Sequence, residues 1–391
     1  MVIAGGDWQL PLIRKARAMG LFVINSNLYP DSPGFRYADV GLVADVRDTE
    51  KNLEFARQYK PHGIATDQTD VSVPTVAYLC EQLGLPGIGA RQAELFTNKF
   101  LLREFLRQSG YPTPEYALCR TLEDAENFCG KFGYPIVIKP PANQGSRGVF
   151  RVSSKPELTS SYAAAASASR DGNVLAEQFI AGDLLTVEGL KTRSCHYSLA
   201  VSRREVFQHN PMLGSAQLYA PDDDQLDFAD LKKQHDAMIQ EMGLSFGLTH
   251  AEYIFSQGKF FLIEVAARGG GSGISSHIVP AVSGIETNEL LIRMSLGERI
   301  EAPTPSGAYP FALLGFLNFA PGTVSTVGGI EKVRSFPGLL HISLKVRPGQ
   351  TLTPPPDGPS RHGLFIAVAQ SREELRALSQ KIEKELRVTY A

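Results

Sequence analysis

A lysine at the end of an apolar run, followed by a loop rich in hydrogen-bond donors, is the first feature that suggests chemistry. The stretch VIKPPANQGSRGV covers residues 137–149 and places Lys139 ahead of two glycines, a serine and an arginine. Glycines let successive backbone N–H groups turn toward one anion, and the charged side chains add further donors. Two interpretations stay open: a surface lysine before an ordinary turn, or a site for phosphate oxygens. A Walker loop is excluded, because there the lysine follows the glycines.

Two glutamates, Glu252 and Glu264, form a second candidate constellation. They flank residues 256–259, so we expect them on the two strands of one hairpin. Carboxylates directly opposite each other repel unless a cation lies between them. For both to lie on one face, residue 252 must oppose residue 264, which predicts a three-residue turn over Gln257–Lys259 with Gly258 left-handed. Two solvated hairpin glutamates are the alternative.

Other polar residues lie where ligands often bind. Asp67 and Asp70, in TDQTDVSV, follow a strand of the first domain, and the strand ends of α/β folds bind ligands. They either hold a substrate amino group or cap a turn. His250 precedes Glu252 by two residues and shares its face if the segment is a strand. His277, in SGISSHIVP, either lines a substrate pocket or is hydrogen-bonded within the structure.

Composition narrows the class of protein. The 391 residues are 43% hydrophobic and 20% charged with a net charge of −2, which is typical of a folded protein with several domains. No basic block indicates a nucleic-acid or anionic-membrane binder. The four cysteines lack metal-type or disulfide-framework spacing, and we see no signal peptide or transmembrane stretch, so a cytoplasmic protein is expected.

The elements that position these residues begin with an alternation of strands and helices. The predicted strands are residues 1–6, 21–27, 40–43 and 62–66, with helices near residues 12–19 and 52–59. This order predicts a parallel α/β sheet. Gly5 and Gly6 lack the full G-x-G-x-x-G pattern, so a tight turn is favoured over a phosphate loop.

The remaining pattern predicts a helix over 96–109, a small α+β lid with a capping box at Thr121–Asp124, and then longer strands. A hairpin is expected over 251–267, and a second capping box, Ser371–Glu374, opens the last helix. The predicted domains are an N-terminal α/β domain (1–95), a linker helix and lid (96–183), a core (184–302) and a C-terminal α+β domain (303–391).

The chain resembles the ATP-grasp superfamily of carboxylate–amine ligases in four stretches that follow one another in order. These are TNKFLLREFL with Lys99, the lid loop, THAEYIFSQGKFFL, and EVAARGGG at 264–271. The superfamily includes biotin carboxylase and bacterial amino-acid ligases. The resemblance covers nearly the whole chain. It implies a Rossmann-like N-terminal domain, a central ATP-grasp domain with its lid, and a C-terminal α+β domain that completes the core.

The resemblance implies ATP as a cofactor. Lys99 and Lys139 would reach the phosphates, and the lid loop would close over them; its candidate residues are Gly145, Ser146, Arg147 and Gly148.

The hinge LAEQFIAGD (175–183) would contact adenine through Glu177 and the backbone of Gln178 and Ile180. Leu184 stands where the family usually places a glutamate for the ribose, and Asp183 would substitute from one position away.

It also implies a metal and a substrate site. Glu252 and Glu264 would hold Mg²⁺, with Mn²⁺ as an option, although Ala266 replaces a usual asparagine ligand. Arg268 and Lys139 would be catalytic, with Arg268 holding a carboxylate or acyl phosphate. The implied substrate-site residues are Arg268, Gly269, Gly270, His277, Asp67 and Asp70.

The implied function is ATP-dependent joining of a small-molecule carboxylate to an amine through an acyl phosphate, with release of ADP and phosphate. A carboxylase acting through carboxyphosphate and a nucleotide-binding protein without catalysis are the alternatives. Neither a nucleic-acid nor a membrane partner is expected, and a homodimer is possible.

Overall fold

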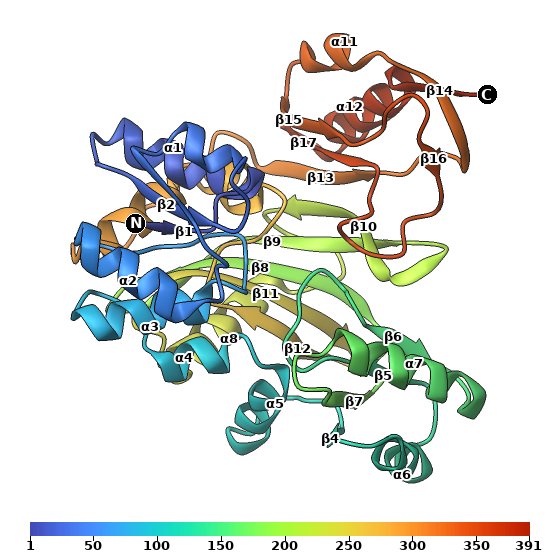
Figure 1. Ribbon diagram of the computed structural model, residues 1–391. Helices are drawn as coiled ribbons and strands as arrows, with labels where there is room; N and C mark the ends of the chain where they lie inside the picture. Colours follow the sequence, from blue (N-terminus) through green and yellow to red (C-terminus); the bar gives the residue numbers. More distant parts are fainter.

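The N-terminal part forms a small parallel sheet covered by helices. The computed structural model describes residues 1–391, and its first sheet has the order β1-β2-β3 (Figure 1). The strands are β1 (Val2–Ile3), β2 (Ile24–Asn27) and β3 (Val40–Val43); the helices are α1 (Leu10–Ala18), α2 (Thr49–Tyr59), α3 (Val73–Leu83) and α4 (Ala90–Leu95). The predicted strand over 62–66 is reduced to one bridge, Val2 to Ala65.

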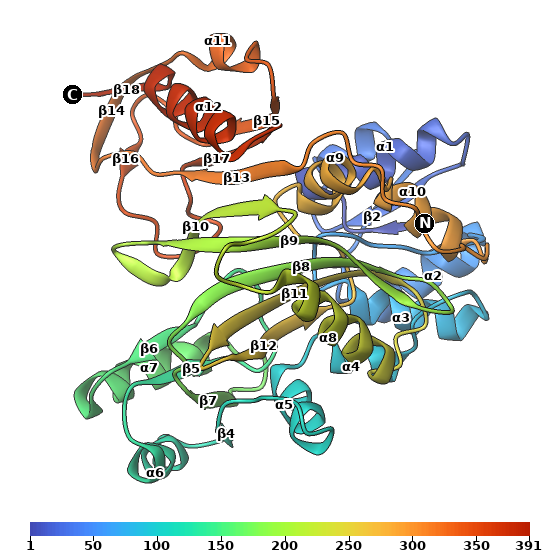
Figure 2. The ribbon, with the colours of Figure 1, turned by 180° about the vertical axis from the view of Figure 1, so that it is seen from behind.

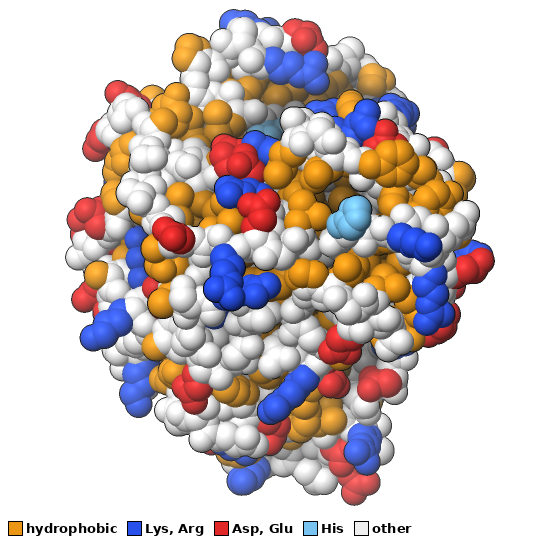
Figure 3. Space-filling model, turned by 90° about the vertical axis from the view of Figure 1, so that its left-hand side faces the viewer, with side chains coloured by type: hydrophobic (Ala, Val, Ile, Leu, Met, Phe, Trp, Pro, Cys, Tyr) orange, Lys and Arg blue, Asp and Glu red, His pale blue; other side chains and the backbone are white.

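The glycine pair after β1 serves packing. A Cβ at Gly5 would lie 2.1 Å from Asn25 Oδ1, and the Gly6 N–H is bonded to the Gln9 side chain at 3.1 Å in the 3₁₀ turn Asp7–Gln9. The close approach to Asn25 is possible only without a side chain. This agrees with the strand-to-helix turn interpretation. On the face shown in Figure 3, acidic and basic side chains are interspersed.

A helix and a lid follow. Helix α5 (Lys99–Gln108) begins at the Asn98 cap and leads to a four-stranded sheet of order β4-β7-β5-β6. Its strands are β4 (Tyr116–Cys119), β5 (Ile136–Lys139), β6 (Phe150–Val152) and β7 (Val174–Gln178), with α6 (Leu122–Phe132) and α7 (Lys155–Ala168) packed on it. The capping box between Thr121 and Asp124 is confirmed. No helix of the protein is both long and apolar enough to cross a membrane.

The central sheet has eight antiparallel strands in the order β12-β11-β8-β9-β10-β13-β17-β15. These are β8 (Asp183–Lys191), β9 (His196–Phe207), β10 (Asn210–Ala220), β11 (Gly247–Ser256), β12 (Lys259–Ala266), β13 (Phe311–Leu317), β15 (Leu339–Leu344) and β17 (Gly363–Ala369). Three of them follow residue 303, so the last segment of the chain continues the core sheet. This agrees with the predicted role of the C-terminal part in completing the core.

Helices flank this sheet. Helix α8 (Phe228–Glu241) packs against β9, and Figure 2 shows α12 (Arg372–Glu385) over β13 and β17. The shorter helices are the π-helical Ile274–Ile278, α9 (Val279–Ser283), α10 (Thr287–Ser295) and α11 (Ile330–Arg334). A small sheet of β16 (Thr351–Leu352), β14 (Gly322–Gly328) and β18 (Arg387–Tyr390) closes the chain.

The hairpin β11–β12 pairs Glu252 with Glu264, as predicted, but by a different route. Ser256 pairs with Lys259, so the turn has two residues, Gln257 and Gly258, with φ of 48° and 74°. The predicted three-residue turn is wrong. Because a two-residue turn with both residues left-handed matches the strand twist, the extra residue enters as a β-bulge instead. Tyr253 pairs with Leu262 while Glu252 pairs with Glu264, which leaves Ile263 as that residue.

The bulge is held by a buried arginine. β12 is an edge strand, so its outer carbonyls have no strand partner, and Arg103 of α5 donates to Leu262 O at 3.0 Å and Ile263 O at 2.9 Å. Its Nε lies 2.8 Å from Glu177 Oε1, and Lys139 Nζ lies 2.6 Å from Glu177 Oε2. Buried charges of this kind are stable only when each is paired. The hairpin, α5 and the lid are therefore joined by one ionic cluster.

Replacing Arg103 with methionine should lower the free energy of unfolding by about 3–5 kcal/mol, because two carbonyls and one side of Glu177 lose their partner in a buried site. Arg107→Met on the same helix is the matched control. Its side chain is 52% exposed and its Nη2 lies 3.8 Å from Glu115, so a loss of at most about 1 kcal/mol is expected. Urea unfolding measures both, and equal losses would contradict the role given to Arg103.

Candidate active site

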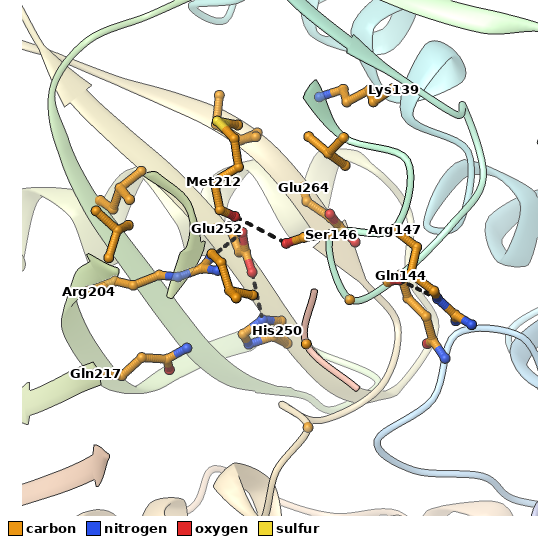
Figure 4. Close-up of a pocket in the computed structure, with 18 of the residues that line it drawn as sticks. Lys139, Gln144, Ser146, Arg147, Arg204, Met212, Gln217, His250, Glu252 and Glu264 are labelled. Atoms are coloured by element: carbon orange, nitrogen blue, oxygen red, sulfur yellow. Dashed lines mark hydrogen bonds and ion pairs between the residues drawn. The ribbon is translucent and has the colours of Figure 1, made fainter. Parts of the chain in front are cut away.

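A cavity of about 850 Å³ lies between the lid, the central sheet and the last segment of the chain. Figure 4 shows Lys139 and the loop of residues 144–147 on one side of it, with Glu252, Glu264 and Arg204 from the sheet. The predicted site residues that line it are Lys99, Lys139, Gly145, Ser146, Arg147, Glu177, Gln178, Ile180, Glu252, Glu264 and Arg268. Sequence reasoning thus placed residues from four separate segments around one space.

Lys139 ends β5 and is only 3% exposed. Burial lowers the pKa of its ammonium to about 8, although Glu177 opposes the shift. Both oxygens of Glu177 are engaged, one by Lys139 and one by Arg103. Glu177, the residue whose side chain is predicted to contact adenine, is therefore the counter-ion of Lys139. Gln178 and Ile180 line the cavity beside it.

Lys99 is the first residue of α5 and connects three parts of the site. Its Nζ donates to Asn143 O at 2.8 Å and lies 3.3 Å from Glu264 Oε2. Its backbone N–H donates to Pro141 O at 2.8 Å. The ammonium therefore lies between the lid loop and the carboxylate pair.

The lid loop adopts left-handed backbone at Gly145, Ser146 and Gly148, with φ of 69°, 59° and 74°. The Ser146 hydroxyl donates to Met212 O at 3.2 Å, as Figure 4 shows, and Gly145 O accepts from the Gly358 N–H at 3.4 Å. The loop thus contacts both the β9–β10 hairpin and the last segment. Gly148 does not line the cavity; a Cβ there would lie 2.8 Å from Ala168, so this glycine serves the turn.

Glu252 and Glu264 each carry a cationic partner. Arg204 Nη1 lies 2.8 Å from Glu252, and His250, confirmed on the same face, lies 3.8 Å from it. Burial alone would raise the pKa of Glu252, but Arg204 and His250 hold it well below its usual range. Position 266 is buried and pairs with His250.

The two glutamates fit Mg²⁺ of the kind that also binds phosphate. This ion commonly takes one or two carboxylates and completes its shell with water and phosphate oxygens. No group of three or more acidic, histidine or cysteine side chains that could hold a metal ion occurs in the protein. Two carboxylates, Glu252 and Glu264, therefore suit an ion that takes its other ligands from water and from the phosphate groups of a bound molecule.

Arg268 is held by Asp70 through two hydrogen bonds of 2.8 Å. Although burial raises the pKa of Asp70, Arg268 outweighs it and lowers that pKa. Asp67 accepts from the Gly269 N–H at 2.9 Å and from Ser275 Oγ at 2.5 Å. Neither aspartate lines the cavity. In the structure their oxygens orient Arg268 and its glycine loop, and the role in binding a substrate amino group stays a prediction.

Two other predicted residues, His277 and Asp183, lie away from the cavity wall. His277 Nδ1 is bonded to Ser276 Oγ at 2.8 Å. Asp183 pairs with Arg203 at 2.5 Å, whereas Leu184 lines the cavity, because neighbouring strand residues point to opposite faces.

Gly269 and Gly270 also lie off the cavity wall and serve packing. A Cβ at Gly269 would lie 2.3 Å from Ser275, and one at Gly270 would lie 2.7 Å from Glu188.

Sequence reasoning missed Arg204, Gln217 and Arg361, which line the cavity. Leu184 pairs with Arg204, and Arg204 pairs with Gln217, so Leu184, Arg204 and Gln217 share one face of the sheet. Strand alternation could have placed Arg204 and Gln217 together once β9 and β10 were taken as a hairpin. No local sequence pattern predicts Arg361 at the cavity, because it belongs to a distant segment of the chain.

Comparisons with known proteins agree with this architecture. A family model described as D-ala D-ala ligase C-terminus matches residues 105–291, and one described as L-amino acid ligase C-terminal domain 2 matches residues 315–391. The uncharacterized protein y4rH of Sinorhizobium fredii is 26% identical over 344 residues, 84% of this chain and 69% of that protein. Formate-dependent phosphoribosylglycinamide formyltransferase of Paraburkholderia xenovorans is 28% identical over 185 residues, and the chain spans only 46% of its length.

Solved structures share the fold over nearly the whole chain. The L-amino acid ligase from Bacillus licheniformis matches with a TM-score of 0.84 at 24% identity, covering 100% of this chain and 98% of that one. The biotin carboxylase domain of the Hydrogenobacter thermophilus 2-oxoglutarate carboxylase, solved with MgADP and bicarbonate, matches with a TM-score of 0.77 at 18% identity, covering 99% and 90%.

The lowered pKa of Lys139 predicts a pH dependence. Raising the pH from about 7 to about 9 deprotonates this ammonium, so affinity for Mg-ADP should fall several-fold. Because unfolding restores the ordinary, higher pKa, the unfolded chain binds more protons above about pH 8, and the stability contribution of this group rises there.

Isothermal titration with Mg-ADP at both pH values measures the change. Lys139→Met should bind weakly at both and lose most of the pH dependence, whereas Lys155→Met, which removes an exposed lid lysine, should retain it. An undiminished pH dependence in Lys139→Met would show that another group is responsible.

Proposed function

We propose that the chain belongs to the ATP-grasp superfamily and is an ADP-forming ligase that joins a carboxylate to an amine through an acyl phosphate, with free amino acids or closely related metabolites as its substrates. The observation that carries this proposal is the meeting of Lys99, Lys139 and the Glu252–Glu264 pair around one cavity. Such a set matches a triphosphate with its metal. ATP and Mg²⁺ are the cofactors of the family, and Mn²⁺ is proposed as a substitute.

The reaction needs activation because a carboxylate is a poor electrophile: the attacking amine would have to expel an oxide. Transfer of the γ-phosphoryl group of ATP to the carboxylate creates a phosphate leaving group, and the amine then attacks the carbonyl carbon. Positioning and charge neutralisation do most of the work in phosphoryl transfer. No protein nucleophile is required.

Each residue has a proposed role in this scheme. Lys99 and Lys139 bind phosphate oxygens, and Arg268, already oriented by Asp70, holds the activated carboxylate and the oxyanion formed on attack. Glu252 and Glu264 would hold Mg²⁺, which when bound neutralises charge on the phosphates. Gln178, Ile180 and Leu184 form the wall against the adenosine.

The lid loop supports the proposal through its contacts. Ser146 reaches Met212 and Gly145 reaches Gly358, so the loop covers the cavity from the lid side. An acyl phosphate is hydrolysed if water enters, and such closure excludes it. The contact of Lys99 with Asn143 O ties the same loop to the helix that carries the first phosphate-binding lysine.

The function is tested by a phosphate-release screen. Purified protein with Mg-ATP and pairs of amino acids should release phosphate only when both a carboxylate and an amine donor are present, and mass spectrometry should find the condensed product. Phosphate release that needs bicarbonate but no amino-acid carboxylate would favour the carboxylase alternative. Tight ATP binding without product from any pair would favour a non-catalytic protein.

Glu264→Ala and Lys139→Ala should each lower turnover by at least about 100-fold, because Glu264 would hold Mg²⁺ and Lys139 would neutralise charge on the phosphates. Glu54→Ala, which removes an exposed glutamate on α2, is the control and should retain full activity. Steady-state phosphate release measures all three variants. An active Glu264→Ala enzyme would remove the metal assignment.

A further inference from the structure

Arg361 is a cation of the cavity wall without a counter-ion. It lies just before β17, and its Cζ stacks 3.5 Å from the centre of the Phe316 ring. One Nη donates to Gly214 O at 2.8 Å, but the buried Nε has no hydrogen-bond partner. Burial, with Arg204 nearby, lowers the pKa of its guanidinium to about 9. An unpaired buried cation is costly unless a ligand completes the site.

Arg204 brings a second guanidinium to the same place. A Cβ at Gly214 would lie 2.5 Å from Arg204 Nε, so Arg204 and Arg361 both approach residue 214. Arg204 pairs with Glu252 through Nη1, and its buried Nε also has no partner. The two guanidinium groups therefore have only one paired carboxylate between them, Glu252 on Arg204, and the Nε of each is left without a partner.

Gln217 adds a neutral donor. It pairs with Arg204 across β9 and β10, and its Oε1 accepts from the Tyr219 hydroxyl at 2.9 Å. Its amide Nε2 is left to donate to a ligand in the cavity. In Figure 4, Gln217 and Arg204 lie together, on the opposite side of Glu252 from Lys139.

The cations assigned above to the phosphates and the activated carboxylate are already paired. Lys139 has Glu177, Lys99 has Glu264, and Arg268 has Asp70. Arg361 has no such partner, and Arg204 keeps a free Nε although its Nη1 pairs with Glu252, so these two guanidinium groups form a separate positive region with open donors. Guanidinium groups of this kind match the two oxygens of a carboxylate or the oxygens of a phosphoryl group.

We propose that Arg204, Arg361 and Gln217 form a second anion subsite, which binds an oxyanion carried by a reactant. The identity of that oxyanion rests on the proposed function: when two amino acids are joined, the amine donor keeps its own carboxylate, which needs a partner away from the phosphoryl group. A phosphate of the nucleotide is the other source of the same chemistry.

Binding to the resting protein tests the subsite without turnover. Trp8, the only tryptophan, lines the cavity, so its fluorescence reports occupancy. L-Alanine and L-alaninamide differ in the carboxylate, and ADP and adenosine differ in the phosphates. Loss of a charge-assisted hydrogen bond should weaken binding by about 10-fold or more.

If the subsite takes the carboxylate, Arg361→Gln weakens binding of L-alanine to near that of L-alaninamide and leaves ADP unchanged. If it takes a phosphate, the variant weakens ADP and leaves adenosine and both alanine derivatives unchanged. Either result supports the subsite and identifies its ligand. Binding of all four within about twofold of the unsubstituted protein would overturn it.

Two further variants serve as controls for these binding experiments. Arg347→Gln removes an exposed guanidinium of the same region outside the cavity and should bind all four probes normally. Arg361→Lys keeps the charge but not the planar fork, so it should show an intermediate loss even where Arg361→Gln fails to fold. If no condensation product forms but Arg361 variants bind weakly, the proposed function fails while the subsite stands.

Discussion

One buried ionic cluster connects the parts that must meet for this site to exist. Arg103 holds the carbonyls of the bulged edge strand and pairs with Glu177, which in turn pairs with Lys139. The bulge places Glu264 opposite Glu252, and the same cluster fixes the lysine of the lid. The two kinds of charge that a triphosphate with its metal requires are thus positioned by a single connected set of contacts.

A second regularity is that several cations of the cavity are already paired with carboxylates. Lys99 with Glu264, Arg204 with Glu252 and Arg268 with Asp70 each lie within hydrogen-bond or ion-pair distance. Pairing makes buried charge tolerable and fixes side-chain direction before a ligand arrives. Sites of this type stabilise developing charge well because little reorganisation is needed. Arg361 departs from this pattern.

Sequence reasoning reached the fold and the opposed glutamates but not the local geometry. Spacing required Glu252 and Glu264 to pair, yet it could not distinguish an odd turn from an even turn with a bulge at Ile263. The pairing of Asp183 with Arg203 depends on strand phase, and the pairing of Asp70 with Arg268 joins residues 198 positions apart, so neither contact could be read from the sequence. Contacts between distant segments depend on sheet order, which no local pattern encodes.

The continuous eight-stranded sheet takes strands from two parts of the chain, and these parts contribute different residues to the cavity. The lysines and glutamates proposed to bind the phosphates and their metal come from the segments before residue 303, whereas Arg361 comes from the segment after it. Substitutions after residue 303 can therefore change which molecules fit the cavity while the residues before it stay the same. The two parts of the chain can therefore change independently of each other, the last segment altering the shape of the cavity without moving the proposed phosphate-binding groups.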